Sequence, residues 1–125
     1  MLTIIKHKAM RDFRKYEMWI SSINLVSDIY QLLKKFPSYE TFGLSEQLRR
    51  ASISISSNIA EGSSRSSPKD FSHFLQISIG SAFEVETQLI IAKNLNYITA
   101  DELKSFQERL CSIERQINHM ISILK

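Results

Sequence analysis

The side chains that most often carry out catalysis or bind metals are few in this 125-residue chain, and their spacing matches no catalytic or metal-binding motif. His7, His73 and His119 are far apart in the sequence, and none has a partner at the spacing of metal ligands. Cys111 has no histidine, lysine or helix start nearby that would activate it, so we interpret it as structural. No HExxH, CxxC, GxGxxG or P-loop sequence occurs. These patterns predict neither a metal site nor a cofactor.

Two closer pairs of chemically active residues also fail as catalytic sites. Glu84 and Glu86 are separated by about 200° around a helix, so they cannot serve one site together. Arg115 and His119 resemble the Arg-x(4–6)-His signature of the HEPN ribonucleases, but too few residues separate them to match it. We interpret them as a polar contact on the outer face of the last helix. The sequence therefore predicts a protein that is not an enzyme.

The positive charge of the chain is concentrated at its N-terminus. The formal net charge is +3, whereas the first fifteen residues carry five basic side chains against one acidic side chain, which leaves −1 for the rest of the chain. The basic side chains of this segment are Lys6, Lys8, Arg11, Arg14 and Lys15. Such a segment either contacts phosphate groups or is a solvated terminus that aids solubility. From so few charges alone, the solvated terminus is the favoured interpretation.

A pair of adjacent arginines, Arg49 and Arg50, lies where a predicted helix must pack against its neighbours. For Arg49 two hypotheses remain open: a clamp between helices, or a phosphate contact made together with Arg65, Lys69 and the N-terminal basic set. For Arg50 we favour the clamp. Glu84, on the following helix, is the expected ion-pair partner of one of the two arginines.

The helix predicted over 44–61 carries an unusual number of small and polar residues, including Asn58 and Glu61. We expect this face to serve helix packing and assembly, either against the next helix near Gly80 or against another copy of the chain. Gly80, Ser81 and Ala82 together should permit a close approach of two helices at mid-length. Gly62 follows the last apolar turn, and we expect it to end the helix in the left-handed conformation.

Apolar residues recur at steps of three and four over four long stretches, which predicts amphipathic helices. Pro37 should end the first helix, Ser67 and Pro68 should begin the third, and Thr99 with Glu102 forms a capping box for the fourth. The predicted helices span about residues 11–36, 44–61, 68–95 and 99–124. The short links favour one all-α domain over residues 1–125, an antiparallel up-down-up-down four-helix bundle, with residues 1–10 as a flexible basic tail.

Cellular location follows from what the sequence lacks. No apolar run approaches the roughly 18 residues of a membrane span, and the N-terminus has no hydrophobic region or cleavage site of a signal peptide. With one cysteine, the chain cannot form an internal disulfide, which favours a reducing compartment. We therefore expect a cytoplasmic protein without a membrane partner.

Several motifs resemble those of the four-helix bundle protein family, whose members are also called 23S rRNA intervening-sequence proteins or S23-like proteins. The resemblance extends from Met10 over nearly the whole chain, with the motifs in the family's order and spacing. The motifs are PSYE at 37–40, GL at 43–44, QLRRA at 47–51, SI at 54–55, NIAEG at 58–62, KDF at 69–71, FL at 74–75, GSA at 80–82 and EVETQL at 84–89.

The resemblance implies a small bacterial protein, and for many family members no function is established. A related branch is the accessory variability determinant of diversity-generating retroelements, a homopentamer that binds nucleic acid and a reverse transcriptase. By this resemblance we expect a homo-oligomer, a pentamer, that binds RNA or DNA. The first hypothesis is thus a non-catalytic RNA-associated oligomer. The alternative is a structural adaptor that binds another protein through an oligomeric ring, without nucleic acid.

Overall fold

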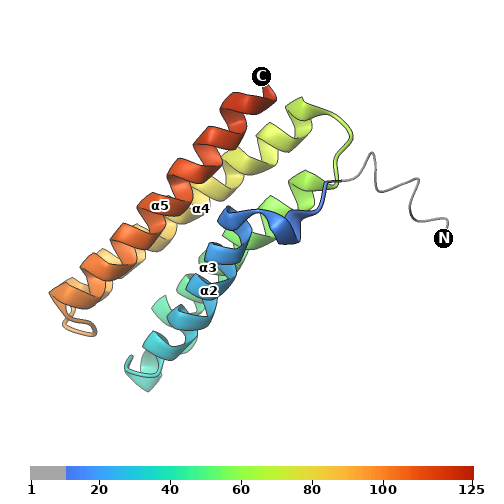
Figure 1. The fold of residues 1–125 in the computed structure, drawn as a ribbon. Coiled ribbons are helices and arrows are strands. Elements are labelled where there is room, and N and C mark those ends of the chain that lie inside the picture. The colour runs from blue at the N-terminus through green and yellow to red at the C-terminus, as the bar shows by residue number, and fades with distance from the viewer. Residues whose placement is uncertain (1–10) are drawn as a thin grey trace.

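The structure is a computed structural model in which residues 11–125 are described. All regular elements of this part of the chain are helices, and it contains no strand (Figure 1). In chain order its elements are the 3-10 helix η1 (Phe13–Lys15), α2 (Glu17–Leu33), the 3-10 helix η2 (Ser38–Glu40), α3 (Leu44–Ser63), α4 (Pro68–Asn94) and α5 (Ala100–Leu124).

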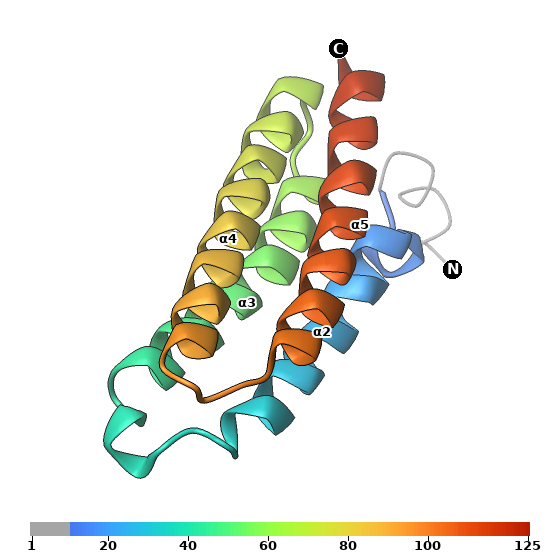
Figure 2. The ribbon, with the colours of Figure 1, turned by 90° about the vertical axis from the view of Figure 1, so that its left-hand side faces the viewer.

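The four long helices form the predicted antiparallel four-helix bundle. Each helix contacts the next one along the chain, and α5 returns to contact α2, which closes the bundle. Successive helices run in opposite directions, so the start of α2, the end of α3, the start of α4 and the C-terminus lie at one end (Figures 1 and 2). We call this the arginine end, because Arg11, Arg14 and Arg65 lie there; the other end carries the α2–α3 and α4–α5 connections.

The first helix differs from the predicted 11–36 range. The side chain of Asp12 accepts a hydrogen bond from the backbone N–H of Arg14 and caps η1 instead. Tyr16 then adopts an extended conformation, with ψ at 126°, before α2 begins at Glu17. The segment before α2 therefore turns at the arginine end rather than continuing the helix, which determines where its basic side chains lie.

The apolar stripes read from the sequence form the core. Leu48, Ile55 and Ile59 of α3 are fully buried, with 0% of each residue exposed. Leu25 of α2 and Leu110 of α5 face them from other helices and are buried to the same extent. Burial of a side chain of this size contributes about 1.5–3 kcal/mol relative to exposure. The core thus holds the helices in fixed register and positions the ends of the bundle.

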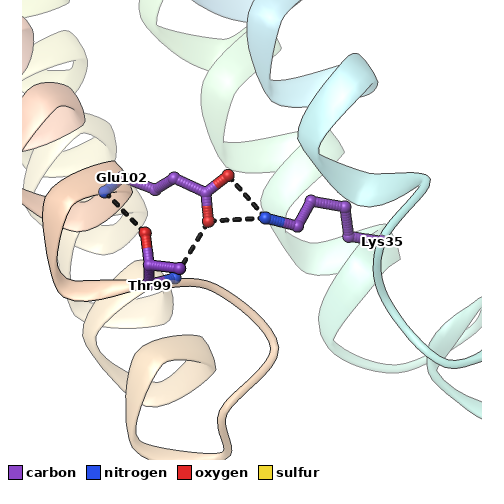
Figure 3. Close-up of polar contacts among 3 residues, drawn as sticks. All are labelled: Lys35, Thr99 and Glu102. Atoms are coloured by element: carbon purple, nitrogen blue, oxygen red, sulfur yellow. Dashed lines mark hydrogen bonds and ion pairs between the residues drawn. The ribbon is translucent and has the colours of Figure 1, made fainter.

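A capping box at the start of α5 also connects the helix to Lys35, in the segment that follows α2 (Figure 3). The backbone N–H of Glu102 donates to Thr99 Oγ1 at 3.0 Å, and the backbone N–H of Thr99 donates to Glu102 Oε1 at 2.9 Å. Lys35 Nζ donates to the same oxygen at 2.6 Å. The hydrogen bond from Lys35, followed by that from Thr99, lowers the pKa of the Glu102 carboxyl below its ordinary value.

Replacing Glu102 with glutamine should lower the free energy of unfolding by about 0.5–1 kcal/mol at pH 7. Because the pKa of Glu102 is lower in the folded protein than its ordinary value near 4.5, the ionised carboxylate stabilises the fold at pH values above 4.5. This stabilisation is lost as the pH falls through the pKa of Glu102 in the folded protein. The difference between wild type and Glu102→Gln, measured by urea denaturation, should therefore be largest at pH 7 and nearly absent at pH 2.5. Asp101→Asn, in the same turn, is the control. Equal losses in both variants at both pH values would contradict this role.

Candidate nucleic-acid interface

Three arginines from two distant segments line one hollow at the arginine end. The hollow has a volume of about 290 Å³. Its walls come from the segment before α2 and from the end of α3 with the link to α4, and Figure 1 shows these two segments side by side. We call it the arginine hollow; its lining residues are Arg11, Phe13, Arg14, Ala60, Ser63, Ser64, Arg65 and Ser66.

Hydrogen bonds fix both walls of the arginine hollow. Arg11 Nη1 donates to the backbone carbonyl of Arg65 at 2.6 Å and joins segments that are 54 residues apart. Arg14 Nη1 donates to Asp12 Oδ1 at 2.8 Å, and Arg65 Nη2 donates to Glu61 Oε2 at 2.8 Å. The guanidinium groups are therefore held in place before any ligand arrives, which reduces the entropy that binding would cost.

Each of these arginines also lies over the face of an aromatic ring. The guanidinium carbon of Arg14 is 4.7 Å from the centroid of the Phe13 ring. The same distance separates Arg11 from the Phe71 ring, and Arg65 from the Phe74 ring. Phe71 and Phe74 lie in the first turns of α4, so the helix contributes to the site. Stacking of this kind preserves the positive charge and fixes the plane of the guanidinium group.

The start of α4 adds to the positive potential beside the arginine hollow. Ser67 caps the helix, because its Oγ accepts a hydrogen bond from the backbone N–H of Asp70 at 3.0 Å, and Pro68 occupies the first helical position. The N-terminus of a helix carries a partial positive charge. Lys69 lies in this first turn and is exposed, as is Lys15 in η1.

The acidic side chains at this end compensate only part of the charge. Five basic side chains lie on its described segments: Arg11, Arg14, Lys15, Arg65 and Lys69. Four acidic side chains lie among them: Asp12, Glu17, Glu61 and Asp70. The local balance remains positive by one charge, and the ion pairs of Arg14 and Arg65 are solvent-exposed, where an ion pair is worth at most about 1 kcal/mol. A phosphate group could therefore compete for these guanidinium groups.

The predicted phosphate-contacting residues are only partly brought together. Arg11, Arg14 and Arg65 share the arginine hollow, and Lys15 and Lys69 lie on the segments beside it. Sixteen residues separate Arg49 from Arg65, which at 1.5 Å per helical residue places them on the order of 20 Å apart. Arg49 Nη2 instead donates to the carbonyl of Thr41 at 3.0 Å. Arg49 therefore ties α3 to the α2–α3 connection. Lys6 and Lys8 lie outside the described residues.

The predicted ion pair between Glu84 and an arginine of α3 is wrong. Arg50 pairs with Glu46 of its own helix, at 3.4 Å, because a spacing of four residues places the two side chains on the same helix face. Arg50 and Glu84 do line the same hollow between α3 and α4, together with the buried Gln88. No ion pair of Glu84 forms within residues 11–125.

The polar face of α3 meets α4 through hydroxyl groups. Ser78 Oγ donates to the carbonyl of Ile55 at 2.9 Å, and Ser81 Oγ donates to Ser54 Oγ at 2.8 Å. Asn58 Nδ2 donates to the carbonyl of Ser54 at 2.8 Å, within its own helix. This face thus serves helix packing within one chain.

Both predictions about the glycines are wrong. Gly62 lies inside α3, and neither it nor any other described glycine has a positive φ; the left-handed residue is Asn96, with φ at 63°, between α4 and α5. A Cβ at position 62 would lie 2.8 Å from Phe74 Cβ and 2.9 Å from Phe71 Cδ1. A Cβ at Gly80 would meet nothing within 4 Å. Of the two glycines, Gly62 is therefore the one at a close approach of α3 and α4, and it lies directly behind the aromatic rings of the site. At mid-length the two helices meet through Ser78 and Ser81 instead.

Sequence reasoning missed the aromatic partners of the arginines. Phe13 lies between two arginines in the sequence, and Phe71 and Phe74 follow the basic link at a helical spacing of three. That spacing of rings beside basic residues was the available signal. It was weak, because phenylalanines at helical spacing are usually core residues, and Phe71 is indeed fully buried as well.

Other chemically active residues remain dispersed. Arg115 Nη1 donates to Cys111 Sγ at 3.1 Å, and Arg115 and His119 line a separate hollow of about 380 Å³ with Tyr16. Over residues 11–125, no group of three or more His, Cys, Asp and Glu side chains is arranged to hold a metal ion. In the same range, no helix has the length and apolar character that crossing a membrane requires.

Glu86 of α4 and Glu114 of α5 form an acidic pair, and the effect of this pair on stability can be tested. Gln107 Nε2 donates to Glu86 Oε2 at 3.1 Å, whereas Glu114 Oε2 is buried without a hydrogen-bond partner among the described residues. Burial, and then the charge of Glu86, raise the pKa of the Glu114 carboxyl. The ionised form of Glu114 is therefore less favourable in the folded protein than in the unfolded chain.

Glu114→Gln should raise the free energy of unfolding at pH 7 by up to about 1 kcal/mol, because it removes a poorly solvated charge and supplies a donor beside Glu86. Because the pKa of Glu114 is raised in the folded state, its carboxyl takes up a proton in the folded protein before it does so in the unfolded chain as the pH falls toward 4.5. Protonation removes the buried charge from the wild type, so the stability advantage of the variant should shrink at low pH. Urea denaturation at pH 7 and pH 4 measures this, with the exposed Glu108→Gln as control. A variant less stable than wild type at pH 7 would refute the assignment.

The fold and site define an all-α bundle with a positively charged end. A sequence model described as the 23S rRNA-intervening sequence protein matches residues 14–119, so the chain belongs to that family. A solved structure of similar fold is a protein of unknown function from the S23 ribosomal protein family of Bacteroides thetaiotaomicron. The two are 27% identical, with a TM-score of 0.77 over 83% of this chain and 97% of the other. Comparison with curated proteins gave no match.

Proposed function

We propose that the protein is a non-catalytic, RNA-associated protein of the bacterial cytoplasm that contacts RNA phosphates at its arginine end. The convergence of Arg11, Arg14 and Arg65 on one hollow supports this most directly, because three guanidinium groups from segments 54 residues apart are held in place there. The description of the family names rRNA and points to the same class of partner.

The charge pattern supports a phosphate partner over an acidic protein. Guanidinium groups match phosphate geometry with two parallel hydrogen bonds, and cationic contacts to RNA release bound counterions. The start of α4, with Lys69 in its first turn, adds a partial positive charge beside the same hollow. Lys15 extends the basic surface on the other side.

Homo-oligomerisation is the second part of the proposal, and the expected state is a pentamer. Exposed apolar side chains on α2 and α3 support it: Ile20 and Ile23 are 38% exposed, and Ile53 is 40% exposed. Such side chains suit a contact between copies. Size-exclusion chromatography with light scattering should give about five times the chain mass of 14.5 kDa. A monomer at micromolar concentration would exclude the ring.

RNA binding is tested by fluorescence anisotropy with a labelled rRNA-derived stem-loop at several salt concentrations. Each phosphate contact contributes about −0.7 to −0.9 to the slope of log K against log salt, so three arginines predict a slope of about −2 to −3 per protomer. If no RNA binds at low salt, or if the affinity for RNA does not change with salt concentration, the proposal is wrong.

An adaptor that binds another protein is the second candidate function. At the end opposite the arginines, Phe42 is 89% exposed and Tyr39 is 77% exposed. Exposed aromatic rings are frequent anchors of protein interfaces. A pull-down that recovers one defined protein, but no RNA, and loses it with Phe42→Ser would favour this function over RNA binding.

A further inference from the structure

The arginine hollow has the size of a site for one small group rather than for a nucleic-acid duplex. Its volume of about 290 Å³ is at the lower end of the pockets that hold small ligands, which are about 300–1,000 Å³. A duplex could lie across the opening and contact the guanidinium groups from outside. Only a nucleotide turned out of a strand could enter.

The walls of the hollow suit a nucleobase better than a bare phosphate. The Phe13 ring and the Ala60 side chain are apolar, and a phosphate would gain nothing from them. Aromatic rings and guanidinium planes are the surfaces on which proteins stack unpaired bases. The Phe13 ring also packs against Trp19 in a T-shaped arrangement, with the ring centroids 5.1 Å apart and the planes at 70°, so it is fixed in orientation.

Serine hydroxyl groups complete the hollow with hydrogen-bond acceptors. Ser63 Oγ donates its proton to the carbonyl of Ala60 at 2.7 Å, and Ser64 Oγ donates to the carbonyl of Glu61 at 2.7 Å. Because these protons are used within α3, the hydroxyl oxygens can accept from a ligand. The amino and imino groups on the edge of an unpaired base are suitable donors, whereas in a duplex they are occupied by pairing.

We infer that the arginine hollow receives one unpaired nucleotide of a single strand, with its base stacked on the Arg14 guanidinium plane that lies over Phe13 and its flanking phosphates on the N–H groups of Arg11, Arg14 and Arg65. This inference rests on the proposed function and specifies it: the preferred RNA is single-stranded or contains a loop or bulge. A single DNA strand offers the same base and phosphate chemistry, so the experiment includes it.

The experiment compares a labelled, unstructured 12-nucleotide RNA, the same strand annealed to its complement, and the matching DNA strand, by fluorescence anisotropy with the full chain. The single RNA strand should bind at least about tenfold more tightly than the duplex, although the duplex carries more charge. If the DNA strand binds more tightly than the RNA strand, the inference of an unpaired nucleotide in the hollow stands, and the nucleotide comes from DNA. Equal or tighter binding of the duplex overturns the inference but leaves the proposed function standing. Absence of binding to all three probes overturns both.

Two variants separate stacking in the hollow from charge. Phe13→Leu removes the ring that holds the Arg14 guanidinium plane and should weaken single-strand binding about 5- to 100-fold, with duplex binding unchanged. Ala60→Leu fills the hollow without touching a charge or a ring, should have the same selective effect, and keeps the test valid if Phe13→Leu folds poorly. Phe83→Leu, which changes an exposed ring near the middle of α4, is the matched control and should bind like wild type. Unchanged single-strand binding in folded Ala60→Leu overturns the inference.

Discussion

Replacing Arg11, Arg14 and Arg65 together with glutamine should weaken RNA binding on the order of 100-fold at 0.1 M salt and make the slope of log K against log salt less steep by about 2 to 3. The reason is that these three side chains supply the fixed guanidinium groups of the arginine hollow. Anisotropy titrations across a salt series measure both quantities, and circular dichroism confirms that the variant folds.

The matched control removes the same number of charges from the other end of the bundle. Lys34 follows α2, Lys93 lies in the last turn of α4, and Lys104 lies near the start of α5, and all three are exposed. The triple variant with glutamine at these positions should bind RNA within about threefold of wild type. If both triple variants lose affinity equally, the binding reflects net charge, and the arginine end is not an interface.

Gly62→Ala should lower the free energy of unfolding by about 1–2 kcal/mol, although alanine is the better helix former. The new methyl group would lie 2.8 Å from Phe74 Cβ and 3.2 Å from the Phe71 carbonyl oxygen, so α3 and α4 must move apart where they cross. The rings that carry Arg11 and Arg65 would move with α4, so the variant should also weaken RNA binding. Urea denaturation measures the loss of stability.

A glycine-to-alanine substitution at Gly80, on the neighbouring helix α4, should have the opposite effect on stability. Gly80→Ala places its methyl group in open space on α4 and should raise the free energy of unfolding by about 0.5–1 kcal/mol through helix propensity alone. The pair of variants thus separates propensity from packing. Stabilisation by both substitutions would show that Gly62 is not at a close helix crossing.

The sequence predicts the bundle well because its determinants are local. The stripe of Leu48, Ile55 and Ile59 has helical spacing, and these residues are buried as expected. The start of α4 and the capping box of α5 follow from side chains that bond within three residues of each other. The two glycines show the limit of this reasoning, since only the crossing point of α3 and α4 decides which of them is crowded.

The candidate site is less predictable because it joins distant segments. The sequence shows that Arg11, Arg14 and Arg65 are basic. It does not show that they converge, because the Arg11–Arg65 contact spans 54 residues and depends on the turn at η1. That turn arises where Asp12 caps a 3-10 helix, in a segment whose spacing alone favoured a continuous helix. Arg49, which has the same side-chain chemistry, is directed to the Thr41 carbonyl by its position near the start of α3.

Chemical-shift mapping is the most direct test of the arginine end as an RNA interface. Two-dimensional ¹H–¹⁵N spectra of the full chain would be recorded as the unstructured RNA strand is added. The largest shifts should fall on the amides of residues 11–15 and 63–70, while residues 34–43 and 94–100 at the opposite end stay in place. Shifts concentrated at the opposite end, or spectra unchanged at RNA concentrations that saturate anisotropy, would contradict the account.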